Sequence, residues 1–151
     1  METETIMVEE VLRHLIEICH DDQCGFGTAA ESVSNSALKA EFFHYSGQFG
    51  QFIADLEREL RNLGQTPPTH GTVVGALRRG WMHLATVITG SDEVAILSAI
   101  LKAEQAAVDT YASALDAPMP DAVQEMLSAQ YSHIVGIRNH IQTLCDRVST
   151  D

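Results

Sequence analysis

Residues 41–44 read EFFH, so a glutamate and a histidine stand three positions apart at Glu41 and His44. On a helix, side chains three positions apart lie on one side and can reach the same metal ion. Glu-x-x-His pairs from two helices of a four-helix bundle are among the protein ligands of a di-iron centre. Whether this pair belongs to such a centre depends on the direction in which its helix presents it.

The elements that position these residues are predicted to be helices. Apolar residues recur with the period of an α-helix along most of the chain, and no long segment alternates with the period of a strand. Together with the glycines and prolines, this pattern predicts helices over 5–33, 36–63, 72–89, 91–115 and 120–148. Asn35 or Ser36 can cap the second helix, Gly64 stops it, and Ser91 can cap the fourth.

The order of these helices predicts a single domain over residues 1–151. Short connections join the first two long helices and the last two, so each pair is expected to form an antiparallel hairpin. The helix over 72–89, anchored by Trp81, lies in the long crossover between the hairpins. We therefore expect an all-α, ferritin-like antiparallel four-helix bundle with a short extra helix in the crossover between helices 2 and 4.

Helical phase argues against EFFH as a metal half-site. The apolar line of its helix consists of Leu38, Phe42, Tyr45, Phe49, Phe52, Leu56, Leu60 and Leu63. At about 100° per residue, Glu41 lies roughly 65° from this line and His44 roughly 125° from it. We therefore interpret EFFH as core phenylalanines framed by a flanking Glu41 and an outward His44.

Glu104 is the most unusual polar position in the sequence. It lies within about 10° of the apolar line of the helix over 91–115, so its carboxyl should be buried. A buried carboxylate needs a hydrogen bond, a cation or a metal, or it stays protonated. On the last helix Gln130 is centred on the apolar line and His133 lies about 65° off it. Residues 130–133 read QYSH, so an amide stands where a second Glu-x-x-His pair would have its carboxylate.

The first helix offers few inward ligands. Glu17 and Glu31 point away from its core line, and Asp22 and Gln23 lie about 50° off it. The candidate metal ligands are therefore Glu104, Gln130, Asp22, Glu41 and His133. Two interpretations remain open. Glu104 joins Gln130 and a tyrosine (45, 111 or 131) in a buried polar network, or it centres a degenerate iron or manganese site.

Two further groups of side chains could bind metal. Glu17, His20, Asp21 and Cys24 share one outer stripe of the first helix, a spacing that zinc can use, and we interpret them as a solvated face. His133 and His140 are seven apart on one flank of the last helix. We expect these two histidines to border the short helix or a subunit contact.

Composition excludes several classes of partner. Nine lysines and arginines stand against 21 aspartates and glutamates, which gives a net charge of −12. This charge argues against nucleic acid and anionic membrane surfaces, which need clustered positive charge. The three cysteines cannot all pair within one chain and form no Cys-x-x-Cys motif. With no signal pattern and no apolar run near 20 residues, these features lead us to expect an acidic, cytoplasmic protein. We also expect a homo-oligomer that forms through bundle faces.

The stretches GALRRGWMHL, ITGSDEVAIL and AEQAAVDTY resemble a bacterial ferritin-like family, the domain-of-unknown-function family 2383. Further similarity lies in LIEICHDDQCGFGTAAESV and QFGQFIADLERELRNLG, so the resemblance covers roughly residues 10–145. Members commonly carry His in place of Arg78 and Glu in place of Cys24. The resemblance implies a five-helix ferritin-like bundle without a settled activity.

Residues and resemblance together lead to two functional expectations. The first is an uncharacterised, non-enzymatic bundle protein with a stress-related role implied by the resemblance. The second is a metal-binding protein or oxidase that holds iron or manganese at Glu104. The incomplete set of inward ligands favours the first expectation.

Overall fold

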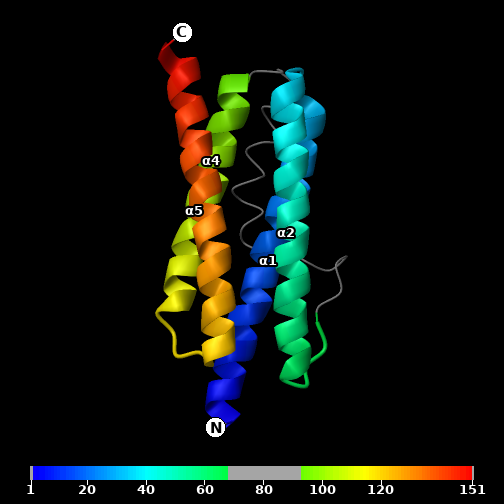
Figure 1. Ribbon diagram of the computed structural model, residues 1–151, viewed down its shortest axis with the longest axis vertical. Coiled ribbons are helices and arrows are strands. Elements are labelled where there is room, and N and C mark those ends of the chain that lie inside the picture. The colour runs from blue at the N-terminus through cyan, green and yellow to red at the C-terminus, as the bar shows by residue number, and fades with distance from the viewer. Residues whose placement is uncertain (1, 68–92, 151) are drawn as a thin grey trace.

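The computed structural model describes residues 2–67 and 93–150, with side-chain burial for 5–67 and 93–148. Four α-helices fill these ranges: α1 over Glu2–Ser32, α2 over Ser36–Asn62, α4 over Glu93–Leu115 and α5 over Asp121–Thr150 (Figure 1). No strand occurs in these two ranges. The expected all-helical, four-helix fold is confirmed for this part of the chain.

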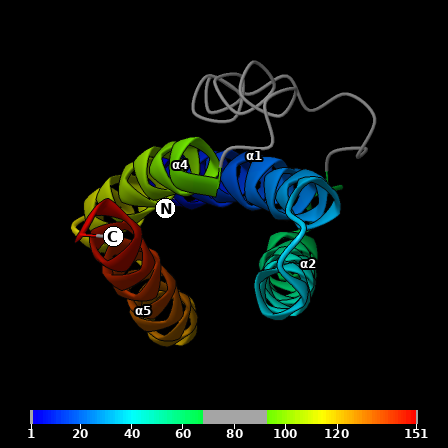
Figure 2. The ribbon, with the colours of Figure 1, turned by 90° about the horizontal axis from the view of Figure 1, so that it is seen from above.

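The four long helices form two antiparallel hairpins. The short link 33–35 joins α1 to α2, and residues 116–120 join α4 to α5. Figure 2, which views the bundle along its length, shows the order α5, α4, α1, α2 around an arc. Packing is far more extensive within each hairpin than between them, and α1 and α4 form the larger junction between the hairpins.

Local chemistry explains where α2 begins and ends. The side-chain Oδ1 of Asn35 accepts hydrogen bonds from the backbone N–H groups of Ala37 and Leu38, at 2.9 and 3.1 Å. Asn35 is thus the N-cap, one of the two predicted caps. At the other end Gly64 adopts a φ of 79°, a left-handed conformation that favours glycine. Its N–H donates to the carbonyl of Arg61 at 2.8 Å, which closes the last turn.

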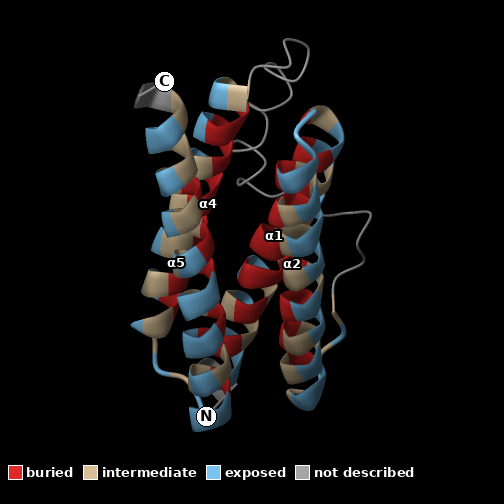
Figure 3. Cartoon of the chain, turned by 45° about the horizontal axis from the view of Figure 1, so that its top comes forward, coloured by how far each residue is buried: buried red, intermediate tan, exposed pale blue. Residues whose placement is uncertain are grey.

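The buried faces of the helices follow the predicted apolar lines. Figure 3 shows buried residues along the inner sides of the helices and exposed residues outside. Phe26 of α1 is fully buried among three aromatic rings of α2, with ring centroids 5.9 Å from Phe42, 5.4 Å from Tyr45 and 5.9 Å from Phe49. One expectation was wrong: Phe43 is 49% exposed, because it stands one position, about 100°, away from buried Phe42.

The predicted helix over 72–89, with Trp81, and the predicted cap Ser91 fall outside the described residues. The described helices include none that is long and apolar enough to cross a membrane. The three cysteines are free thiols: Cys19 is buried, Cys24 is exposed and Cys145 is half-buried.

Replacing Asn35 with alanine should lower the free energy of unfolding by about 1 kcal/mol, because two N–H groups at the start of α2 lose their acceptor. Urea denaturation followed by circular dichroism measures this loss. Asn35→Asp is the matched control, since its carboxylate keeps an acceptor at the cap and should change stability by only a few tenths of a kcal/mol. An Asn35→Ala protein as stable as the wild type would contradict this role of the cap.

Candidate functional site

Glu41 and His44 do not form a site together. His44 is exposed, and its ring lies beside Tyr45 with a centroid separation of 6.0 Å. Glu41 is half-exposed and pairs instead with His140 of α5, whose Nε2 lies 3.2 Å from both of its carboxylate oxygens. The predicted phase of EFFH is therefore confirmed.

The two histidines on the flank of α5 border α2. His140 contacts Glu41, and the exposed His133 lies with its ring centroid 6.0 Å from that of Phe52. The expectation that they border the short helix or a subunit contact stays a prediction, because the short helix lies outside the described residues. Sequence reasoning had placed Glu41 and His133 each about 65° off their core lines, which is where two neighbouring helices meet at their flanks.

Two carboxyl groups are buried at the junction of the hairpins. Glu104 of α4 is fully buried, and Asp22 of α1 is 3% exposed. Within the described part of the chain, no N–H or hydroxyl group donates to either carboxylate oxygen of Glu104, and its hydrogen-bonding neighbour is the carboxyl of Asp22. Sequence reasoning had ranked Asp22 only as a flanking candidate, and the structure places it deep in the bundle.

Burial raises the pKa of Glu104 well above its usual range, and the neighbouring Asp22 carboxyl raises this pKa further. Both effects act against charge, because two carboxylates cannot both ionise cheaply in a dry interior. One proton held between them neutralises one group and lets it donate to the other. Both effects therefore favour the protonated form of Glu104 beside Asp22.

Next to this pair, a chain of hydrogen bonds connects all four helices. The hydroxyl of Tyr111 in α4 lies 3.2 Å from the Sγ of Cys19 in α1 and donates to Oε1 of Gln130 in α5 at 2.7 Å. The Nε2 of Gln130 then donates to the backbone carbonyl of Phe52 in α2 at 3.3 Å. We name this set of four residues the interior chain.

The interior chain corrects part of the network expected from the sequence. Gln130 does pair with a tyrosine, as predicted, and that tyrosine is Tyr111. The same interpretation was wrong for Glu104, whose oxygens receive no hydrogen bond from Gln130 or from any tyrosine. Cys19 had been assigned only to the apolar line, and its place three positions before Asp22 on α1 was the signal that could have drawn attention to it.

The side chains around the carboxyl pair are held in their neutral forms. Burial raises the pKa of the Cys19 thiol far above its ordinary value. Burial also raises the pKa of Tyr111, with a further contribution from Cys19. The pKa of Tyr45 is raised by burial and by the charges of Glu41 and Glu104. A neutral buried thiol is a poor nucleophile, so Cys19 is suited to packing and hydrogen bonding.

A di-iron centre does not fit the described interior. Such a centre takes carboxylates from all four helices and imidazoles from two. Here α1 supplies Asp22 and α4 supplies Glu104, whereas Gln130 of α5 uses both ends of its amide in the interior chain. On the outer stripe of α1, Cys24 and His20 have Sγ and Nδ1 3.9 Å apart. Over residues 2–67 and 93–150, no three His, Cys, Asp or Glu side chains gather closely enough to hold a metal ion.

The model of one protein family, the domain of unknown function DUF2383, matches residues 7–117. The chain belongs to the DUF2383 family. The matched range holds most of α1 and all of α2 and α4, and with them Asp22, Glu104, Cys19 and Tyr111. Gln130 lies beyond it, so the DUF2383 match ends earlier than the range to residue 145 expected from the resemblance. No curated protein matches the chain.

Tyr111→Phe should lower the free energy of unfolding by about 1–3 kcal/mol, because it leaves Oε1 of Gln130 buried without its donor. Chemical denaturation of both proteins gives this difference. Tyr131→Phe serves as control, since Tyr131 is half-buried and takes no part in the interior chain. Equal losses in the two variants would contradict the importance of the interior chain.

Stability should fall as pH rises above about 4.3, the usual pKa of a glutamate in an unfolded chain. Above that pH the unfolded state loses a proton that the folded state keeps on Glu104, whose pKa is raised. Each pH unit then costs up to about 1.4 kcal/mol until the folded pKa is reached, beyond which the contribution of Glu104 is constant.

Urea titrations at a series of pH values test this slope. Glu104→Gln should flatten this slope. Glu31→Gln removes an exposed carboxylate instead and should leave the slope unchanged. Each variant removes one carboxylate, so general repulsion from the net charge of −12 contributes equally to both slopes and drops out of their difference. Parallel curves for Glu104→Gln and the wild type would show that Glu104 does not hold the proton.

Proposed function

We propose that this protein is a non-enzymatic bundle protein of ferritin-like architecture, in which Asp22 and Glu104 form a structural carboxyl pair that shares one proton. The observation that carries the proposal is the environment of Glu104. It is fully buried, its neighbour is a second buried acid, and no N–H or hydroxyl group of the described residues donates to its oxygens. One proton shared by the two carboxyls satisfies both of them without any further ligand.

The physical role of the pair is to specify how the two hairpins meet. Asp22 belongs to the first hairpin and Glu104 to the second, so the pair forms only when α1 and α4 have the correct vertical register. A shift by one turn would separate the two carboxyls and leave Glu104 buried without its neighbour, at a cost of several kcal/mol. Buried polar groups of this kind contribute specificity more than net stability.

The interior chain supports the same role. Tyr111 and Gln130 connect α4 to α5, Cys19 connects α1 to α4, and the carbonyl of Phe52 brings in α2. Every one of these groups is neutral and already hydrogen-bonded, which suits a scaffold and leaves no activated nucleophile. The three free thiols are in keeping with a reducing, cytoplasmic compartment. The stress-related role and self-association stay predictions.

One observation favours metal binding as a second candidate. The neighbour of the buried Glu104 carboxyl is a second acid, and a cation could neutralise the pair as well as a proton could. Asp22 and Glu104 would then hold a single iron or manganese ion between their carboxylates. The arrangement supplies fewer strong ligands than these metals usually take, so we rank this candidate second.

Elemental analysis of protein purified from cells grown with added iron and manganese separates the two candidates. We expect far less than one equivalent of either metal, and no change in thermal midpoint on chelation. Glu104→Gln should cost less than about 1.5 kcal/mol, since the amide can still donate to Asp22. Near-stoichiometric metal that disappears in both Glu104→Ala and Asp22→Ala would overturn the structural role and establish the second candidate.

A further inference from the structure

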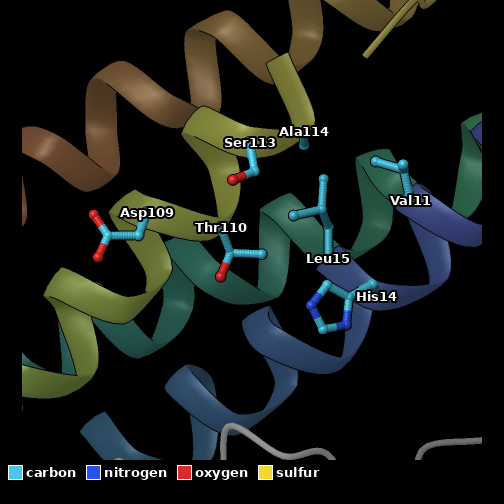
Figure 4. Close-up of a pocket in the computed structure, with 7 residues that line it drawn as sticks. All are labelled: Val11, His14, Leu15, Asp109, Thr110, Ser113 and Ala114. Atoms are coloured by element: carbon cyan, nitrogen blue, oxygen red, sulfur yellow. The ribbon is translucent and has the colours of Figure 1, made fainter. Parts of the chain in front are cut away.

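A cavity of about 420 Å³ opens on the outside of the junction between α1 and α4. Figure 4 shows its lining: three residues of α1 and four of α4. They are Val11, His14, Leu15, Asp109, Thr110, Ser113 and Ala114. The volume falls in the range of about 300–1,000 Å³ that is typical of small-molecule sites. The cavity is separate from the carboxyl pair, which lies at Asp22 and Glu104.

Small side chains on α4 explain why this cavity, called the groove below, is open. Thr110, Ser113 and Ala114 succeed one another along the edge of α4 that faces α1, so no large side chain of α4 fills the space in front of Leu15. Leu15 and Ala114 are buried and form an apolar floor. Thr110 donates its hydroxyl to the carbonyl of Ala106 at 2.9 Å, so its polar atom is already satisfied by its own helix.

Polar groups stand at the edges of this floor. His14, Asp109 and Ser113 are exposed. In Figure 4, Asp109 lies at one end of the groove and Val11 at the other, with the floor and His14 between them. An occupant that contacts both ends must therefore be elongated, with a polar group at one end and an apolar body along the rest.

Hydrogen bonds from residues outside the lining hold the carboxylate of Asp109 in place. Its Oδ1 accepts a hydrogen bond from Nε2 of Gln105 at 3.0 Å. The Oε1 of Gln105 accepts one in turn from Nε of Arg138 on α5, at 2.8 Å. This relay fixes the acidic end of the groove before any ligand arrives, which reduces the ordering cost of binding. Arg138 itself is not part of the lining.

Charge decides the class of ligand. Asp109 is the one lysine, arginine, aspartate or glutamate among the lining residues, and the chain as a whole carries a net charge of −12. Both features attract cations and repel anions. From the apolar floor and the acidic end, we infer that the groove binds a small organic amine, with its ammonium at Asp109 and an apolar ring over Leu15 and Ala114.

Titration of the ¹⁵N-labelled full chain with tryptamine tests this assignment by NMR. We expect saturable shifts of the backbone amides that line the groove. Two probes with the same ring serve as controls: tryptophol, which is neutral, and indole-3-propionate, which is an anion. Tryptamine should bind most tightly and indole-3-propionate most weakly.

Asp109→Asn should weaken tryptamine binding about fivefold, as expected for one partly exposed charge contact, and leave tryptophol binding unchanged. Glu125→Gln, at an exposed position on α5, makes the same change in net charge and should leave both affinities as they are. Ser113→Leu should fill the groove and weaken all three probes.

Each other outcome overturns the assignment. Equal affinity of the three ring compounds would mean that the groove does not select for an amine. An unchanged tryptamine affinity in Asp109→Asn would remove Asp109 from the site. Shifts that do not saturate, or that lie elsewhere on the bundle, would show that the groove is not a binding site. None of these results bears on the protonation of Glu104, so the proposed role of the carboxyl pair is tested independently.

Discussion

Two acids from different hairpins are buried as neighbours in the interior of the bundle, and in the role that we propose they set how the hairpins meet. Asp22 belongs to the first hairpin and Glu104 to the second, and among the described residues no N–H or hydroxyl group donates to either oxygen of Glu104. Apolar packing between helices tolerates small slips, because one leucine can replace another against the same surface. A buried acid pair tolerates them less, since a slip would leave the Glu104 carboxyl in an apolar medium without its neighbour.

The fold was largely predictable because its signals are local. Helical periodicity, Asn35 and Gly64 set where α2 begins and ends, and the apolar lines identified the buried residues of each helix. The centred position of Glu104 was visible in the same way. Its burial follows from the phase of its own helix and needs no knowledge of the neighbours.

The composition of the site was harder to predict, because it depends on contacts between helices. Phase gives the direction of a side chain but not the height at which a second helix meets it. For this reason Gln130 was expected beside Glu104, whereas it pairs with Tyr111, and Asp22 was ranked low although it is the neighbour of Glu104. Glu41 and His140, 99 positions apart in sequence, meet for the same reason.

The bond between Gln130 and Phe52 differs in kind from the others in the interior chain. Gln130 donates to the main-chain carbonyl of residue 52, so the acceptor is present whatever side chain stands there. Natural variation at position 52 can therefore change the aromatic contact with His133 and still keep the polar link between α2 and α5. In evolutionary terms this link is encoded by a single codon, that of Gln130, while its partner is guaranteed by the backbone of the helix.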